Sequence, residues 1–491
     1  MSTHHQPTSG SFDLRAAARQ SMVEHGFEPD FPPEAAHEVA DLAAHPPKPE
    51  RNAVDLRHLL WSSVDNDTSR DLDQIEYAEK LSDGGVKVLV GIADVDLFVP
   101  KGSALDRHAG LETVTVYAGV RNFPMLPDEL STGMTSLLED EDRACVVTEF
   151  VVNQQNHVNS SRIYPALVCN KAQLAYPSLG SWLEGRAEAP PKVAESAELQ
   201  AQLKLQNEVA QRLRGERLER GALTLETIEA RAVIAGSSID IVAEERNAAT
   251  DLIEDFMVAA NGVVARTLRD QQIPSIRRVV KIPRRWDRIV QLAGQLGGRL
   301  PEQPDSKALN DFLCWRKEKD PDHFADLSLA VVKLMGPGEY ILERPGDTPE
   351  GHFGLAVEDY THSTAPNRRY ADLVTQRVVK AMIASAPSPY SEEELAAIAA
   401  NCTSKATAER KVEREMQKRI AAVVLRHRVG EIFRAIVTGV TDRGTFVRTL
   451  QPHVDGMLVH PQQGVDVGDR LNVKLVRTDP VHGFIDFAGV P

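Results

Sequence analysis

The sequence predicts an α+β fold in which a mixed sheet with helices is followed by a small β-barrel and preceded by a short helical segment. Three observations support this prediction. Alternating, β-branched runs fill residues from about 52 to 170, helical periodicity fills about 193 to 428, and strand-like runs return in roughly the last 60 residues. A chain of 491 residues is too long for one hydrophobic core. We therefore expect three parts, over residues 1–50, 51–428 and 429–491.

The first part is expected to hold two short helices. In "DLRAAARQSMVEHG", residues 13–26, Asp13 is a candidate N-cap and Gly26 a stop signal. The second helix, in "PPEAAHEVADLAAH", has Pro33 in its first turn, and "PPKPE" at 46–50 follows as a stiff linker. The pair is a small domain, a flap on the next part or a nucleic-acid-binding helix pair, although no recognition helix is evident.

The central part is expected to begin with strands and to end with helices. The strand-like runs are "KVLVGIADV", "ETVTVYAGV", "ACVVTEFVV" and "SSRIYPALV". The helical runs include "AELQAQLKLQNEVAQRLRGERLE", "ATDLIEDFMVAANGVVARTLRDQ", "LSLAVVKLMG" and "YADLVTQRVVKAMIAS", and a last helix ends near Arg428. In the third part, five short runs separated by glycine-marked turns predict an OB-type barrel.

Composition restricts the class of protein. No apolar run approaches about 18 residues, and the N-terminus lacks a basic-then-apolar signal pattern. The four cysteines are far apart, as expected for reduced thiols. We therefore expect a cytoplasmic protein with no membrane partner.

The net charge of −15 argues against a protein that coats nucleic acid non-specifically. Basic residues nevertheless gather locally. Residues 361–434 hold 13 Lys or Arg against 8 Asp or Glu, and residues 276–288 hold six basic residues against one acid. A basic channel within an acidic protein is therefore compatible with the sequence.

A cluster of acids lies in "SVDNDTSRDLDQIE", residues 63–76. We expect Asp71 and Asp73 to point the same way along a strand while Asp65 approaches from the end of the preceding strand, with Asp67 facing solvent. Three such oxygen donors suit Mg²⁺ or Mn²⁺. The alternatives are a solvated acidic loop and a calcium loop ending at Glu76, but the calcium loop needs glycine at its sixth position, where this sequence has Arg70.

A second cluster is basic. Arg368 and Arg369 follow Pro366 at the start of the predicted helix "YADLVTQRVVKAM". Guanidinium groups at a helix N-terminus make a strong phosphate site. The alternative is an arginine pair that caps an acidic neighbour such as Asp372.

Together the two clusters carry a resemblance to a known family. "YTHSTAPNRRYADL" is similar to the "YTHFTSPIRRYADL" signature of the RNase II/RNase R family, whose catalytic RNB domain begins with an aspartate cluster like "DNDTSRDLDQ". "GIADVDLFVPKGSALDRHA" and "LIEDFMVAANGVVA" resemble further blocks of that family, so the similarity runs in order from about 55 to 380. The region after Gly430 resembles the OB-type RNA-binding domain first described in ribosomal protein S-one.

The resemblance implies an exoribonuclease that hydrolyses single-stranded RNA from 3′ to 5′, needs Mg²⁺ and releases nucleoside 5′-monophosphates. It implies metal-site roles for Asp65 and Asp71 and a catalytic role for Asp73. It also implies that Arg368 stabilises the scissile phosphate, with Arg369 as a second catalytic candidate.

Four aromatic residues are expected to bind RNA. The resemblance places Tyr117 and Tyr176 at the end of an RNA channel. In the barrel, Phe433 and Phe446 are candidates for exposed rings that stack on bases, although both lie in alternating strands and would equally suit its core.

The sequence also departs from the family pattern. Gln74 follows Asp73 where the family has a second aspartate, and a glutamine carbonyl ligates a cation without adding charge. Asn367 replaces an isoleucine, and 50 residues leave no room for the usual two cold-shock domains. We expect a monomer without a small-molecule cofactor. A weakened, RNA-binding form and an endoribonuclease stay open as alternatives.

Overall fold

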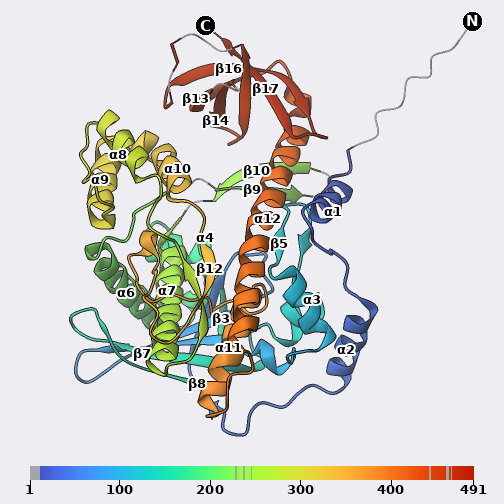
Figure 1. Cartoon of the computed structure of the whole chain (residues 1–491), viewed down its shortest axis with the longest axis vertical. Coiled ribbons are helices and arrows are strands. Elements are labelled where there is room, and N and C mark those ends of the chain that lie inside the picture. The colour runs from blue at the N-terminus through green and yellow to red at the C-terminus, as the bar shows by residue number, and fades with distance from the viewer. Residues whose placement is uncertain are drawn as a thin grey trace, which may run out of the picture.

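The computed structural model describes residues 12–226, 229–235, 238–244, 246–441, 444–460, 464–465 and 467–490. Its helices and strands form a large α/β body, a long connecting helix and a β-barrel at the C-terminal end (Figure 1). The expected mixed α+β architecture with a C-terminal OB-type barrel is confirmed.

Two N-terminal helices, α1 (Leu14–Glu24) and α2 (Pro33–Ala44), pack on the body of the molecule. Asp13 caps α1 as predicted, because its carboxylate accepts the N–H groups of Arg15 and Ala16. The buried face of α1 shares a hydrophobic cluster with Val412 and Met416 of a C-terminal helix. Because α2 likewise contributes to the main core, neither helix has a core of its own.

The sheet of the body has the strand order β1-β8-β2-β3-β4-β7, and β7 pairs with β8 as well. Strand β8 runs parallel to β1 and β2, and the other pairings are antiparallel, so the sheet is mixed as predicted. Its strands are β1 (Val54–Asp55), β2 (Trp61–Asp65), β3 (Gln74–Lys80), β4 (Val86–Ala93), β7 (Asp142–Val152) and β8 (Val158–Ala175).

One predicted strand is largely absent. The run "ETVTVYAGV" contributes only β5 (Val116–Tyr117), which pairs with β6 (Asn122–Phe123). The helix α3 (Ala104–Glu112) extends into the start of this run and ends on Thr113, which takes a left-handed conformation with φ of 60°. The β-branched residues of this run predicted a longer strand. In the structure they follow the end of a helix instead, because tertiary packing overrides their strand propensity.

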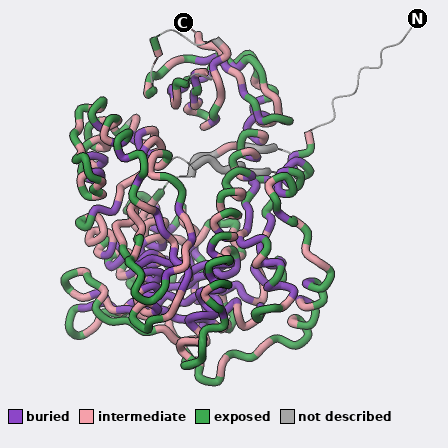
Figure 2. Tube along the Cα trace, in the orientation of Figure 1, coloured by how far each residue is buried: buried purple, intermediate pink, exposed green. Residues whose placement is uncertain are grey.

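Helices cover both faces of the sheet, and each face packs in its own hydrophobic cluster. Buried residues are concentrated in this body of the molecule (Figure 2). Val64 and Ala78 belong to the layer under α6 and α7, whereas Trp61 and Ile75 belong to the opposite layer. Such alternation is expected of strands buried on both faces. The helices that follow α3 are α4 (Tyr176–Leu183), α5 (Pro191–Ala194), α6 (Ala197–Glu219), α7 (Ala248–Asp270), α8 (Trp286–Gln295), α9 (Ser306–Lys319), α10 (Phe324–Met335), α11 (Tyr370–Ile383) and α12 (Glu392–Leu425).

Besides β5 and β6, two antiparallel strand pairs lie outside the main sheet: the hairpin of β9 (Glu229–Ala235) with β10 (Ser238–Glu244), and β11 (Ser275–Val279) with β12 (Glu339–Glu343), which helices α8 to α10 separate in sequence. Beyond α12 the chain closes a barrel in the order β13-β14-β15-β17-β16. Its strands are β13 (Ile432–Thr441), β14 (Gly444–Thr449), β15 (Asp455–His460), β16 (Arg470–Asp479) and β17 (Phe484–Val490). Among the described residues, no helix has the length and apolar character that a membrane crossing requires.

Candidate active site

The acidic cluster lies at one end of the main sheet. Strand β2 ends on Asp65 and β3 begins on Gln74, so Asp71 and Asp73 lie in the connecting loop. The expectation that these two aspartates follow the alternation of a strand is therefore wrong, because pairing with β4 starts only at Gln74. Asp65 does stand at a strand end, and Asp67 is exposed, both as predicted.

Asp73 is buried and is held by a segment from the far side of the sequence. Its side chain is 1% exposed, and its Oδ1 accepts the backbone N–H of Asn367 at 3.0 Å. Its Oδ2 is buried without a hydrogen-bond donor, and Nε of Arg368 lies 3.5 Å from it. Burial raises the pKa of Asp73 to about 7, although the charge of Arg368 acts in the opposite direction.

The two adjacent arginines have different surroundings. The Arg368 side chain is 46% exposed, so its guanidinium is accessible beside Asp73. Arg369 instead donates to Asp372 Oδ1 at 2.6 Å. This pairing is the alternative that the sequence left open, and it engages Nη2 of Arg369. A contact of Arg369 with phosphate stays a prediction.

Asp372 is the centre of that loop. Its Oδ1 also accepts the backbone N–H groups of Thr364 and Ala365, each at 2.8 Å. These bonds fix the turn that precedes α11. This turn positions Arg368, whose backbone carbonyl accepts the N–H of Thr115 at 3.0 Å.

Asp65 and Asp71 complete the acidic side of the site. Asp65 Oδ1 accepts the N–H of Asn66 at 2.6 Å and the hydroxyl of Ser69 at 2.8 Å, and burial raises its pKa. Asp71 Oδ2 accepts the hydroxyl of Tyr117 at 3.2 Å.

Both predicted tyrosines lie at this site. Tyr117 contacts Asp71, and Tyr176 opens α4 directly after Ala175, which pairs with Asp65 across β8 and β2. Burial raises the pKa of both hydroxyls, and Arg368 is close enough to lower both. The structure therefore brings together six of the predicted residues: Asp65, Asp71, Asp73, Arg368, Tyr117 and Tyr176.

The donor set suits a divalent cation, although it is not a preformed cluster. Among the described side chains, no three His, Cys, Asp or Glu groups stand close enough to hold a metal ion. The carboxylates of the cluster repel one another because they carry like charges. The cationic group beside Asp73 is Arg368. Oδ2 of Asp73 is the observation that favours a cation, because this buried oxygen accepts no hydrogen bond and has only the ion pair with Arg368 at 3.5 Å among the described residues.

Gln74 and Glu76 are buried polar residues on β3. Gln74 is buried beside Asp73, and its role as a ligand stays a prediction. Glu76, which the sequence reading used only in the rejected calcium loop, is fully buried, and both of its carboxylate oxygens lack a hydrogen-bond partner. The sequence contained one signal for Glu76: it follows Gln74 by two residues, and this spacing places both side chains on the same face of a strand.

The two predicted RNA-binding phenylalanines of the barrel differ in exposure. Phe433 is 4% exposed and packs edge-to-face on Phe487, with ring centroids 6.1 Å apart. The expectation of an exposed Phe433 is wrong, because alternation along a strand does not reveal which side of a closed barrel is inside. Phe446 is 37% exposed, and its contact with RNA stays a prediction.

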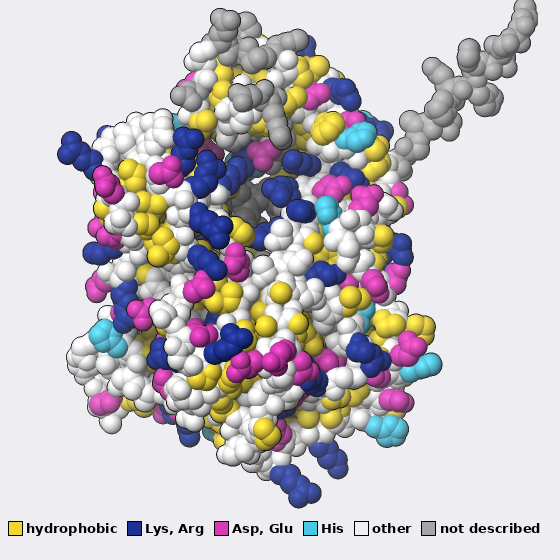
Figure 3. Space-filling view, in the orientation of Figure 1, with side chains coloured by type: hydrophobic (Ala, Val, Ile, Leu, Met, Phe, Trp, Pro, Cys, Tyr) yellow, Lys and Arg dark blue, Asp and Glu magenta, His cyan; other side chains and the backbone are white. Residues whose placement is uncertain are grey.

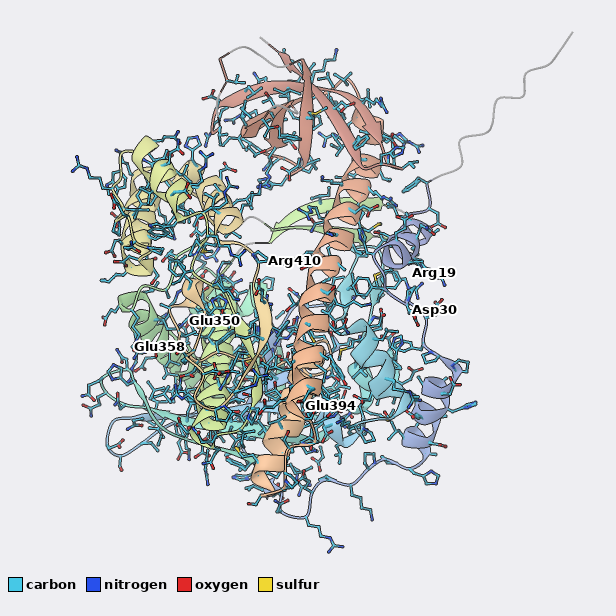
Figure 4. All side chains as sticks on the ribbon, in the orientation of Figure 1. Arg19, Asp30, Glu350, Glu358, Glu394 and Arg410 are labelled. Carbon is cyan, nitrogen blue, oxygen red and sulfur yellow. The ribbon has the colours of Figure 1, made fainter. Side chains whose placement is uncertain are left out.

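Lys and Arg side chains gather around a hollow on the face between the barrel and the body (Figure 3). Arg410 lies on α12 beneath the β9–β10 hairpin (Figure 4). Arg278 of β11 stacks on Tyr340 with its guanidinium carbon 4.7 Å from the ring centre. Part of the basic run at 276–288 is internal, however, since Arg277 is buried in an ion pair with Glu343.

Comparison with known families assigns the fold. Residues 53–385 match the RNB domain, and residues 431–490 match the RNase II-type exonuclease C-terminal S1 domain. The chain therefore belongs to the RNB-domain family of RNase II and RNase R.

Individual relatives show the extent of the similarity. Ribonuclease R of Escherichia coli K12 is 30% identical over 88% of this chain and 54% of its own length. The structure of Mycoplasma genitalium RNase R with ribose-methylated single-stranded RNA has a TM-score of 0.85 at 22% identity, covering 98% of this chain and 78% of that one. Yeast Ssd1, described as a pseudonuclease, has a TM-score of 0.71 at 16% identity, covering 95% and 59%. The chain spans roughly half to two thirds of the length of the curated relatives it matches.

Proposed function

We propose that this protein is an exoribonuclease that removes nucleotides from single-stranded RNA in the 3′-to-5′ direction and releases nucleoside 5′-monophosphates. The observation that carries the proposal is the junction at Asp73, where a buried acid with one oxygen that accepts no hydrogen bond lies beside an accessible arginine. Membership of the RNB-domain family and the name of its relatives support the polarity and the substrate.

The reaction needs a divalent cation, Mg²⁺ or Mn²⁺. Asp65, Asp71 and Asp73 would hold it, and the side-chain carbonyl of Gln74 would complete the ligand set. When bound, the cation supplies Lewis-acid polarisation of the phosphate and a lowered pKa of a bound water. The fit rests on the hard oxygen donors and on Oδ2 of Asp73, which accepts no hydrogen bond.

The residues of the chain divide the remaining work. Asp73 orients the attacking water through Oδ2, while the N–H of Asn367 fixes its other oxygen. Water attacks phosphorus, the bond from phosphorus to the 3′ oxygen of the preceding nucleotide breaks, and that oxygen takes a proton. Arg368 donates to the non-bridging oxygens as negative charge develops on them.

The RNA is held by stacking and by charge. Tyr117 and Tyr176 flank the acids and hold the terminal nucleotides, and Phe446 offers a face in the barrel for upstream bases. The basic hollow shown in Figure 3 leads the backbone toward the site. In this proposal residues 1–50 form a helical segment, 51–428 the catalytic domain and 429–491 the RNA-binding barrel, in a cytoplasmic monomer.

A labelled-RNA assay tests the proposal. Purified protein is incubated with single-stranded RNA labelled at the 3′ or the 5′ end, with Mg²⁺ present or chelated. We expect mononucleotides to appear at once from the 3′ label and a shortening ladder from the 5′ label, both only with the cation. Internal fragments would indicate an endoribonuclease. Intact, bound RNA would indicate a protein that binds RNA without cleaving it.

A further inference from the structure

The cation site lacks one acid at residue 74, and Glu76 lies buried on the same face of the same strand. Residues two apart on a strand point to the same side and are roughly 7 Å apart. Glutamate is one methylene longer than aspartate, so its carboxylate reaches back part of that distance. The question is whether Glu76 belongs to the core or to the site.

The surroundings of Glu76 do not satisfy a carboxylate. Its neighbours across the sheet are Ser62 on β2 and Val90 on β4. The amide of Gln206 on α6 donates to the backbone carbonyl of Glu76 at 3.3 Å and to the hydroxyl of Ser62 at 3.4 Å. Neither carboxylate oxygen of Glu76 has a partner, which is costly for a buried polar group that serves packing alone.

The charge that acts on this carboxylate belongs to the acidic cluster. Asp65 is close enough to raise the pKa of Glu76, after burial itself. After burial, the charges of Asp65 and Glu76 also raise the pKa of Tyr176, the tyrosine at the start of α4. Glu76 therefore lies near Asp65 and Tyr176.

We propose that Glu76 is the fourth acidic residue of the cation site and replaces the aspartate that the family pattern has at residue 74. It binds the cation with its carboxylate oxygens, directly or through a cation-bound water. The inference rests on the proposed metal dependence, but it concerns a residue that the family pattern does not use. It also explains how Gln74 is tolerated, since the site regains the unit of negative charge that glutamine lacks.

Cation binding by the whole protein, measured without RNA, tests the proposal. Titration with Mn²⁺ is followed by calorimetry and by the electron paramagnetic resonance of free Mn²⁺. We expect Glu76→Gln, which keeps the size of the side chain, to weaken binding roughly 10–100-fold. Asp67→Asn is the matched control, because it removes an equal charge from an exposed position in the adjacent loop, and its affinity should stay within about twofold of the unchanged protein.

A second variant separates a site role from a packing role. In the double variant Glu76→Gln with Gln74→Asp, the acid returns to the position used by the family, and we expect most of the cation affinity to return. A residue that only fills the core would not be rescued in this way. Unchanged affinity in Glu76→Gln, or no recovery in the double variant, would overturn the assignment.

Thermal unfolding gives an independent readout. Since Glu76 is buried without a partner, Glu76→Gln should unfold at the same or a higher temperature than the unchanged protein when cations are chelated. Its gain in unfolding temperature on adding Mn²⁺ should be smaller. A lower unfolding temperature in chelator would favour a packing role and contradict the proposal. No saturable binding by the unchanged protein would contradict the cation site itself, whereas normal binding with no effect of Glu76→Gln would contradict only the role of Glu76.

Discussion

The backbone N–H of Asn367 donates to Oδ1 of Asp73 across 294 positions of sequence, at 3.0 Å. This bond joins the acidic loop after β2 to the turn before α11. It leaves Oδ2 of Asp73 facing Arg368, so one backbone donor decides which oxygen is available for chemistry.

Asp73→Asn should abolish RNA cleavage and leave RNA binding within about twofold. Asparagine keeps the shape of the side chain but removes the charge that holds the cation and the water. Cleavage of labelled RNA and fluorescence anisotropy of bound RNA measure the two effects. Asp67→Asn should cleave normally, and cleavage retained in Asp73→Asn would remove Asp73 from the mechanism.

Arg368→Lys should lower kcat by roughly 10²–10³-fold, because lysine keeps the charge but loses the planar fork that matches phosphate oxygens. Its unfolding temperature should change little, since the side chain is half exposed. Single-turnover kinetics with saturating enzyme report the chemical step. A loss confined to KM would assign Arg368 to RNA binding rather than to the reacting phosphate.

Arg369→Met should instead destabilise the protein by about 3–5 kcal/mol, because it leaves the buried carboxylate of Asp372 without its cation. Urea unfolding measures the change. Adding Asp372→Asn should recover part of the loss, since the unpaired charge is then gone. A stable Arg369→Met protein with no activity would place Arg369 on the phosphate after all.

The barrel phenylalanines should respond in opposite ways. Phe446→Ala should weaken RNA binding by about 1–3 kcal/mol with little change in stability, as expected for an exposed stacking ring. Phe433→Ala should cost about 3–5 kcal/mol of stability, because it opens a cavity beside Phe487. Anisotropy titrations and denaturant unfolding of the whole protein measure both. Equal RNA affinity in Phe446→Ala would remove that ring from the RNA path.

Glu409 should make RNA binding depend on pH. Burial, together with the neighbouring Glu413, raises the pKa of Glu409 to about 7, and Arg368 lies close enough to oppose this shift. Glu409 is therefore charged above pH 7 and neutral below it, so lowering the pH from 8 to 6 removes a negative charge near the phosphate site and should tighten binding. Fluorescence anisotropy of bound RNA at fixed salt measures this affinity. The measurement uses the Asp73→Asn variant, so that neither RNA cleavage nor titration of Asp73 contributes to the pH dependence.

In that background Glu409→Gln should bind RNA at pH 8 as tightly as its parent binds at pH 6. It should also lose most of the pH dependence between these values. An unaltered pH profile would show that other groups control it.

The sequence was sufficient for the order of the elements and for most of the site, because these depend on local patterns. Helix α6 spans the predicted run, and Asp67 is exposed as expected. Orientation was harder to predict. Arg368 and Arg369 are adjacent and chemically equal, and the three-dimensional position of Asp372 separates a guanidinium that is accessible beside Asp73 from one that is held in an ion pair.

The other errors have the same origin. Phe433 and Phe446 have similar sequence surroundings, but closure of the barrel places one inside and one outside. Glu76 was overlooked because its burial depends on α6 covering a sheet face, and α6 lies more than a hundred residues further along the chain. Tertiary contacts between distant segments decide these features, and local patterns do not contain them.

The division of the site between distant segments also has a consequence during protein synthesis. The ribosome completes Asp65, Asp71 and Asp73 early, but the turn that supplies the Asn367 N–H and Arg368 emerges only after most of the chain has been made. A nascent chain therefore carries the acids without the groups that complete them. For most of its synthesis, the chain therefore holds only the acidic half of the site.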